Sequence, residues 1–431
     1  MLRNRMKELV SWKSQNTRNP LLLLGGRQVG KTYLLLEFAK SEYEDYIYMN
    51  LEKEPLISTL FDKDLDPKRI LSEIELNYMK KIDPDNTLII IDEIQMEMKA
   101  VTALKYFSEE CSNYHIVCAG SLLGVAINRE QYSFPVGKVE FHYLYPFTFD
   151  EFLQGIGKEH YLPKINECYS QNIAMPELAH HSLIDLYKQY LYIGGMPAAI
   201  RAYIDCNKDI VEFDRSVHQN IINAYIADMS KYTSIAEVMK VQAIYKSIPD
   251  QLAGNYNKFK YSRVEKGAKA LTYGSSIEWL LLSQVSIECP MVSRGEIPLS
   301  VYKESKYFKL YLSDIGLLMA MTNVPYIIMV RDSEHNLFKG AITENYVAQQ
   351  LRAKGHDLYY WKHNTHEVDF ILQDEDQIIP IEVKTAANKR SRSLKEYIRV
   401  YEPKVSIRIS TKNFGMSDSI RSIPLYAVYC I

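Results

Sequence analysis

Short, continuous apolar runs alternate with stretches of helical spacing in the first third of the chain. The runs lie at residues 21–24, 46–50, 88–91 and 116–119, and glycines follow the first run before a helix-like stretch over 31–40. Strands that are apolar on both sides are typical of a parallel sheet with helices on both faces. The pattern therefore predicts an α/β architecture, of the kind that binds nucleotides, for this part of the chain.

The pattern changes near residue 156, where long amphipathic stretches rich in Tyr and Leu begin. Residues 194–197 (GGMP) predict a turn, and residues 258–282 carry apolar side chains at helical spacing. Short β-like pieces follow over 285–301 and are interrupted by proline and glycine. Helices followed by a small hairpin favour a helical and winged-helix region.

A third pattern begins at Gly340. A helical stretch over 341–353 precedes strand-like runs at 357–361, 368–373 and 378–383. A helix followed by strands indicates a small α/β domain in this part of the chain.

Length and composition agree with several domains. A chain of 431 residues with 47% apolar and 24% charged residues has the composition of an ordinary globular protein, at roughly 100 to 200 residues per domain. Its formal net charge of −2 means that any nucleic-acid surface has to be a local patch.

Cysteine usage and hydropathy bear on the compartment. The 6 cysteines are scattered without a CxxC pair, which favours reduced thiols and a cytoplasmic location. The most membrane-like segment, 315–330, is shorter than the ~20 apolar residues of a span and contains a proline. We therefore expect a cytoplasmic protein that does not cross a membrane.

The strongest chemical motif is a glycine-rich loop between the first apolar run and the following helix. It matches GxxxxGK[ST] and consists of Gly25, Gly26, Arg27, Gln28, Val29, Gly30, Lys31 and Thr32. Glycines allow backbone N–H groups to surround phosphates, and a helix N-terminus favours negative charge. Lys31 is expected to reach the β- and γ-phosphates and Thr32 to ligate Mg²⁺, which predicts ATP and Mg²⁺ as ligands.

Two acids follow the apolar run that ends at Ile91. Asp92 is expected to hold Mg²⁺ through water, and Glu93 to polarise the attacking water, which favours hydrolysis over transfer to another substrate. Ser121 follows the next run, where its side chain either senses the γ-phosphate or simply forms a turn. The predicted catalytic residues of this site are Lys31 and Glu93.

Carboxylates and a lysine gather on the predicted C-terminal strands. Asp369 lies on one strand, and Glu382 and Lys384 share one face of the next, because side chains in a strand alternate with a period of two. Glu367 shares the face of Asp369, and Glu344 on the preceding helix is placed to reach the same metal. Such groups suit Mg²⁺-assisted phosphodiester hydrolysis, and they equally form buried ion networks.

Several segments together resemble the AAA-type ATPases of bacteria and archaea. They are GGRQVGKT at 25–32, IIIDEIQ at 89–95, CAGSLL at 118–123 and YPFTFDEFL at 145–153. The resemblance implies an ATPase, and it allows for a homo-oligomer because relatives of this type often form rings. Where relatives carry an arginine after a glycine before the last segment, this chain has Gly137-Lys138, and Arg129 is a substitute candidate.

The C-terminal residues resemble the PD-(D/E)xK nuclease superfamily, with Asp369, Glu382 and Lys384 on the D…ExK positions and Glu344 on the helix position. Nearly the whole chain resembles AAA-type ATPases fused to a C-terminal domain of unknown function with this nuclease-like fold. The recurring segments are 194–197, 309–311, 314–316, 344–345 and 367–370. The resemblance implies metal ligation by Asp369, Glu382 and Glu344, and it leaves cleavage open.

Two basic segments bear on nucleic acid. Lys389, Arg390, Arg392, Lys395 and Arg399 follow the nuclease-like motif, and Lys258, Lys260, Arg263, Lys266 and Lys269 lie in the expected winged helix with Tyr256, Phe259 and Tyr261 interleaved. Both segments could hold a DNA backbone. The alternatives are a solvated amphipathic helix for the first and a protein-binding element for the second.

These patterns predict an α/β chain with a P-loop NTPase parallel-sheet domain at 1–200, a helical and winged-helix region at 201–335 and a small α/β nuclease-like domain at 336–431. The expected function is Mg²⁺-dependent ATP hydrolysis coupled to a C-terminal module that acts on nucleic acid, with DNA as the expected partner. The alternative is an ATP-controlled switch or adaptor whose C-terminal domain binds a partner without cleavage.

Overall fold

The computed structural model of the chain divides into two compact units, Met1–Tyr145 and Pro146–Ile431. The structure describes residues 1, 3–121, 135–230, 235–254, 258–327, 337–385 and 392–431. The candidate residues Arg129, Tyr256, Lys389 and Arg390 lie outside these ranges. The expected division into three domains is finer than these two units and stays a prediction.

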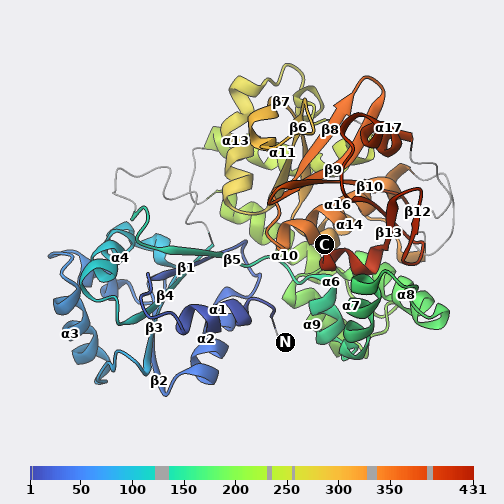
Figure 1. Cartoon of the computed structure of the whole chain (residues 1–431). Coiled ribbons are helices and arrows are strands. Elements are labelled where there is room, and N and C mark those ends of the chain that lie inside the picture. Colours follow the sequence, from blue (N-terminus) through green and yellow to red (C-terminus); the bar gives the residue numbers. More distant parts are fainter. Residues whose placement is uncertain (2, 122–134, 231–234, 255–257, 328–336, 386–391) are drawn as a thin grey trace. The chain divides into compact units, whose positions relative to one another are not determined.

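The first unit is a parallel sheet between helices (Figure 1). Its helices are α1 (Met6–Lys13), α2 (Lys31–Glu42), α3 (Pro67–Tyr78) and α4 (Met98–Glu110), and its strands are β1 (Leu21–Leu24), β2 (Asp45–Asn50), β3 (Thr87–Asp92), β4 (His115–Gly120) and β5 (Glu140–Tyr143). The strand order is β2-β3-β4-β1-β5, with parallel pairing throughout. The predicted apolar runs therefore form β1 to β4, and the parallel α/β fold is confirmed.

Both faces of this sheet are buried, which explains why its central strands are continuously apolar. On one face, Leu22, Ile89 and Ile116 belong to a core cluster with residues of α3 and α4. On the other face, Trp12 of α1 lies against Phe38 of α2, with ring centroids 6.5 Å apart. The sheet is thus held rigidly from both sides, and its strand ends have fixed positions.

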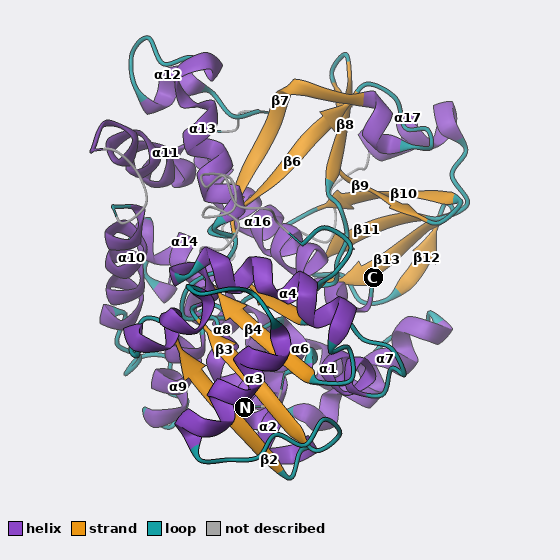
Figure 2. Cartoon of the chain, turned by 90° about the vertical axis from the view of Figure 1, so that its left-hand side faces the viewer, coloured by secondary structure: helices purple, strands orange, loops and turns teal. Residues whose placement is uncertain are grey.

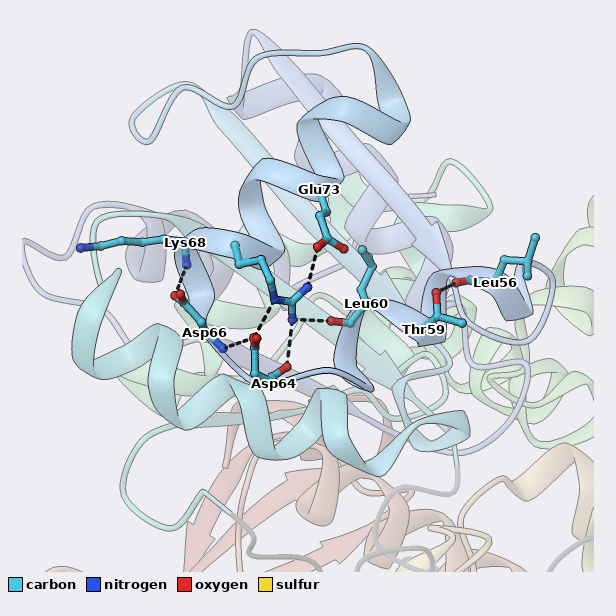
Figure 3. Close-up of polar contacts among 8 residues, drawn as sticks. Leu56, Thr59, Leu60, Asp64, Asp66, Lys68 and Glu73 are labelled. Atoms are coloured by element: carbon cyan, nitrogen blue, oxygen red, sulfur yellow. Dashed lines mark hydrogen bonds and ion pairs between the residues drawn. The ribbon is translucent and has the colours of Figure 1, made fainter.

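Local side-chain contacts fix the start of α3 (Figure 3). Asp66 accepts a hydrogen bond from the N–H of Lys68 at 2.9 Å and caps the helix, while Pro67 occupies its first turn. Arg69 forms ion pairs with Asp64 at 2.6 Å and with Glu73 at 2.9 Å. This helix therefore begins where its own sequence provides a cap.

The second unit combines helices with a mixed sheet (Figure 2). Its helices are α6 (Phe149–Gly155), α7 (Leu162–Gln171), α8 (Glu177–Ile193), α9 (Pro197–Asp205), α10 (Ser216–Met229), α11 (Ile235–Ala253), α12 (Tyr261–Val264), α13 (Ala270–Leu282), α14 (Ile315–Met321), α16 (Leu337–Ala353) and α17 (Arg392–Tyr401). Its strands are β6 (Ser286–Val292), β7 (Lys303–Leu312), β8 (Tyr359–His363), β9 (His366–Asp374), β10 (Gln377–Val383), β11 (Ser406–Ser410), β12 (Gly415–Ser417) and β13 (Ile420–Pro424).

One sheet spans the described strands of this unit, in the order β12-β13-β11-β10-β9-β8-β6-β7. The antiparallel hairpin β6–β7 joins the C-terminal strands because β6 pairs in parallel with β8, with Met291 opposite Tyr360. The expected winged-helix unit is therefore not shown. The hairpin that suggested a wing is the edge of a larger sheet.

Two of the recurring segments meet at a buried junction in the second unit. Asp314 accepts hydrogen bonds from the N–H of Gly195 at 2.6 Å and from the N–H of Leu317 at 3.0 Å. Gly194 has φ +76°, and a Cβ built there would lie 2.5 Å from Asp314 Oδ1. Because the carboxylate and the backbone come so close, only glycine fits at position 194.

Helix α16 carries amide side chains that bind backbone groups at the end of β7 and at the start of α14. Asn345 donates to the carbonyl oxygen of Leu312 at 3.0 Å and accepts from the N–H of Leu312 at 2.8 Å. Gln349 accepts from the N–H of Ile315 at 2.9 Å. These buried bonds fix β7 against α16, which decides where Lys309 and Glu344 meet.

Among the described residues, no helix is long and apolar enough to cross a membrane. The most membrane-like segment of the sequence contributes the short helix α14, which is buried in the second unit.

Replacing Gly194 with alanine is expected to lower the free energy of unfolding by about 2–4 kcal/mol, because the new Cβ meets Asp314 in a left-handed conformation. Gly274→Ala is the matched control, since a Cβ there meets nothing within 4 Å. In α13 this control should stabilise the chain by about 1 kcal/mol or less. Urea unfolding monitored by circular dichroism measures both, and equal stability of the two variants would contradict the close junction.

Candidate functional site

The carboxyl ends of the parallel strands meet at one edge of the first unit. Gly25 follows β1, Asp92 ends β3 and Gly120 ends β4. Strand β4 stands between β1 and β3, so the glycine-rich loop and the acids come from strands that are not neighbours. Ligands of open parallel sheets bind at this edge, and the structure places the predicted residues of the nucleotide site there.

The glycine-rich loop has a backbone that side chains would obstruct. A Cβ at Gly25 would lie 2.3 Å from the carbonyl oxygen of Leu144, and Gly30 has φ +96° at the N-terminus of α2. Gln28 also has a positive φ, of 63°. The loop therefore turns tightly and ends at a helix N-terminus, where partial positive charge attracts phosphate.

Lys31 lies inside this loop. Its ammonium group donates to the carbonyl oxygens of Gly25 and Gly26, each at 2.9 Å, and the side chain is buried. The cation is thus held where the loop would surround a triphosphate, and a phosphate oxygen can replace the carbonyl contacts. The role of Lys31 in binding phosphate stays a prediction.

Thr32 and Asp92 are in direct contact. The Thr32 hydroxyl donates to Asp92 Oδ2 at 2.7 Å, and Tyr48 of β2 donates to the same oxygen at 2.8 Å. Burial and the nearby Asp92 carboxylate raise the pKa of Tyr48 to about 12, so this phenol keeps its proton at neutral pH. A hydroxyl and a carboxylate oxygen side by side are the hard ligands that suit Mg²⁺, so these residues fit the metal.

Glu93 follows with an unusual backbone. Its φ of 52° and ψ of 42° are left-handed, which costs a non-glycine residue roughly 1–2 kcal/mol. Gln95 donates to Glu93 Oε2 at 2.5 Å. Strain of this kind concentrates at functional sites. Here the backbone changes direction at Glu93, directly after β3 ends at Asp92. Ser121 is buried immediately after β4, at the same sheet edge.

Tyr48, Gln95 and Arg3 contact the residues of this site, although no role was predicted for them from the sequence. Arg3 donates to the carbonyl oxygen of Val29 in the loop at 3.1 Å and also contacts the carbonyl oxygen of Tyr145. Tyr48 could have been recognised from its place near the end of a predicted strand. Arg3 offers no local signal, because its partners lie far along the chain.

At the C-terminal cluster, the structure brings together the residues of the D…ExK pattern. Strands β9 and β10 are antiparallel, with Phe370 opposite Ile381. Asp369 accepts a hydrogen bond from the N–H of Val383 at 2.7 Å, and Lys384 forms an ion pair with Glu382 at 2.8 Å. The expected proximity of these strands is confirmed, while the catalytic roles of Asp369, Glu382 and Lys384 stay predictions.

A further lysine occupies this cluster. The ammonium of Lys309, on β7, lies 2.7 Å from Glu344 Oε1 and 2.8 Å from Glu367 Oε1. Tyr311, two residues along the same strand, also donates to Glu344. Glu344, the helix residue of the predicted metal site, therefore lies close to the C-terminal strands. Its carboxylate forms an ion pair with Lys309, for which no role was predicted from the sequence.

Burial and the carboxylate of Glu344 raise the pKa of Asp369 to about 7, while Lys309 and Lys384 act in the opposite direction. Burial alone would lower the pKa of Lys309, but Glu344, Glu367 and Asp369 hold it well above its usual range. Lys309 is thus held as a cation among acids, and Asp369 is a weaker acid than an exposed aspartate.

Neither the nucleotide site nor the C-terminal cluster has enough described side-chain ligands to hold a metal ion by themselves. Among the residues that the structure describes, no group of three or more His, Cys, Asp or Glu side chains is arranged to hold a metal ion. In the first unit, Mg²⁺ would share its ligands with nucleotide and water. In the second unit, the assignment of Asp369, Glu382 and Glu344 as metal ligands stays a prediction.

The described part of the basic C-terminal segment forms α17, where two of the basic side chains are paired with acids. Lys395 lies 2.8 Å from Asp418, and Arg399 lies 2.7 Å from Glu396. In the other segment, Lys258 lies over the ring of Tyr307 at 4.0 Å. The side chains of Arg263, Lys266 and Lys269 are exposed around α12 and the start of α13.

Residues 17–153 match a family model described as an AAA domain. The chain carries an AAA-type ATPase domain. Residues 184–326 and 339–428 match two domain families of unknown function, DUF8612 and DUF4143. None of these matches establishes a nuclease fold for the C-terminal part, and a search of curated proteins found no match to the chain.

Several solved structures contain similar chains. The ORC2 protein of Aeropyrum pernix in ADPNP–ADP complexes is 14% identical over 79% of this chain and 94% of that chain, with a TM-score of 0.36. The ORC1 protein of the same organism in complex with DNA is 12% identical over 77% and 95%, with a TM-score of 0.28. AMPPCP-bound DnaA of Aquifex aeolicus is 15% identical over 64% and 85%, with a TM-score of 0.29. TM-scores this low support no conclusion about the function of this chain.

Replacing Tyr48 with phenylalanine is expected to lower kcat for ATP hydrolysis about 5- to 20-fold, because Asp92 loses one of the donors that orient it. Tyr46→Phe is the matched control, on the same face of β2 but away from Asp92. Phosphate release at saturating Mg²⁺ and ATP measures both. A Tyr48→Phe enzyme as fast as the wild type, or a control that is equally slow, would show that this phenol does not serve the site.

Proposed function

We propose that the first unit binds ATP with Mg²⁺ and hydrolyses it at the edge formed by residues 25–32, Asp92 and Glu93. The observation that carries this proposal is the 2.7 Å contact between Thr32 and Asp92, because it joins the loop to the acidic strand end. Bound Mg²⁺ would neutralise charge on the phosphates and fix their orientation.

Each residue then has a separate task. The glycine-rich loop and Lys31 hold the triphosphate, while Thr32 and Asp92 hold the metal. Glu93 orients and polarises the attacking water. Ser121 at the end of β4 is the residue that would contact the γ-phosphate. A homo-oligomer and a cytoplasmic location remain part of the proposal.

Lys31→Ala is expected to abolish ATP hydrolysis and to weaken ATP binding, because the triphosphate loses its main cation. Glu93→Gln is the informative partner variant: it should keep nucleotide affinity and lose turnover by about 100-fold or more. Phosphate release and binding of a fluorescent ATP analogue separate the two effects. Retained turnover in purified Lys31→Ala protein would refute the assignment.

For the second unit, we propose nucleic-acid binding without cleavage, under control of the nucleotide state of the first unit. Lys309 favours binding over cleavage, which the sequence left open, because its ammonium lies between two of the acids. The exposed Arg263, Lys266 and Lys269 support DNA as the partner, since basic side chains near one helix can contact a phosphate backbone.

Replacing Lys266 and Lys269 together with glutamine is expected to weaken duplex DNA binding and to reduce the slope of log affinity against log salt by about 2, since each lost phosphate contact removes ~0.9. Lys63→Gln/Lys158→Gln changes the net charge equally at exposed positions elsewhere and serves as the control. Fluorescence anisotropy at several salt concentrations, with and without an ATP analogue, measures affinity and its coupling to nucleotide.

Three outcomes would contradict this proposal or a part of it. If the double variant and the control bind DNA alike, the basic segment is not the contact. If plasmid is nicked with Mg²⁺ or Mn²⁺, and nicking is lost in Asp369→Ala or Lys384→Ala, then the second unit is a nuclease. DNA affinity that is unchanged by the ATP analogue would separately count against nucleotide control.

A further inference from the structure

Lys309 is the most unusual charge in the second unit. It lies on β7 between Phe308 and Leu310, both buried, and its own side chain is only 7% exposed. A buried lysine is stable only when anionic partners compensate its lost hydration. Glu344 and Glu367 provide them, at 2.7 and 2.8 Å, and come from α16 and β9.

We propose that Lys309 is the built-in cation of this cluster, and that its ammonium takes the place which a divalent metal would occupy between Glu344 and Glu367. The N–O distances are those of charge-assisted hydrogen bonds. Mg²⁺ needs carboxylate oxygens at about 2.0–2.1 Å in octahedral order. A metal could not reach both carboxylates with the ammonium between them, and the two cations would also repel each other.

The surroundings keep Lys309 in this position. Asn345 holds both backbone groups of Leu312, three residues along the same strand, so β7 cannot slide against α16. The ring of Tyr360 lies 5.0 Å from the Lys309 ammonium and adds a favourable cation–π contact. Tyr311 occupies a further lone pair of Glu344. Lys309 is therefore a fixed part of the fold.

The charges of the cluster already balance nearly without a metal. Lys362 lies 3.8 Å from Glu367, and Lys384 lies 2.8 Å from Glu382, so each glutamate has a lysine within reach. Two buried oxygens, Glu367 Oε2 and Glu382 Oε2, have no hydrogen-bond partner among the described residues. A metal could still be attracted to these two points of the described cluster, and the tests below address them with Glu367→Gln and Glu382→Gln.

A latent metal site follows from this arrangement. Without Lys309, Glu344 and Glu367 would face each other as partly buried carboxylates that have lost their shared cation. Oxygen ligands of this kind attract Mg²⁺ or Mn²⁺. The wild-type chain is therefore expected to bind no divalent cation in the cluster, whereas removal of Lys309 creates a site. This inference goes beyond the proposed function and does not depend on ATP hydrolysis.

The test compares full-length wild type with Lys309→Ala, both freed of metal and nucleotide, by thermal unfolding with and without Mn²⁺. Lys309→Ala should unfold at a lower temperature than wild type, and its unfolding temperature should rise by about 3–4 °C when the Mn²⁺ concentration is ~50 times the dissociation constant. The unfolding temperature of the wild type should rise less when Mn²⁺ is added. Lys309→Ala/Glu367→Gln is the matched control, in which the Mn²⁺-dependent rise should disappear. A rise that is equal in wild type and Lys309→Ala would overturn the proposal.

A second measurement applies even if Lys309→Ala does not fold. Mn²⁺ titration of the wild type, followed by electron paramagnetic resonance, gives the amount of bound metal directly. Asp369→Asn and Glu382→Gln should bind as much Mn²⁺ as the wild type, because neither acid holds metal while Lys309 is present. Bound Mn²⁺ that is lost in either variant would overturn the proposal and place a metal in the cluster.

Discussion

The hydrogen bond from Thr32 to Asp92 is the interaction on which the nucleotide site depends. It joins residues that are 60 positions apart in the chain, at a distance of 2.7 Å. The contact forms only because β1 and β3 run parallel on either side of β4 and end at one sheet edge. Burial of both faces of the sheet, rather than the contact itself, provides the stability that holds this geometry.

The second unit relies on a different principle, in which buried polar groups satisfy one another. Asp314 binds backbone N–H groups near Gly195, and Asn345 binds the backbone of Leu312. Each such group would be costly alone, so the network disfavours any other arrangement of these segments. Lys309 with its glutamates extends this network to full charges, and the same groups that resemble a nuclease site thereby also serve the fold.

The sequence pattern predicted those parts of the structure that depend on residues close together in the chain. The apolar runs of β1 to β4 and the loop at 25–32 follow from periodicity and glycine spacing, and the structure confirms both. Strand β5 has alternating burial over only four residues, so periodicity alone did not reveal it. The predicted wing is not shown by the structure, and the sequence of the hairpin β6–β7 gives no sign that β6 also pairs with β8. Lys309 meets its partners through tertiary packing, which no spacing in one sequence encodes.

A crystal structure of the chain with Mg²⁺ and a non-hydrolysable ATP analogue tests the central claim most directly. The account predicts that the triphosphate lies within residues 25–32, that Lys31 contacts its terminal phosphates, and that Mg²⁺ lies beside Thr32 and Asp92. Nucleotide bound elsewhere, or a metal that contacts neither Thr32 nor Asp92 directly or through water, would contradict it.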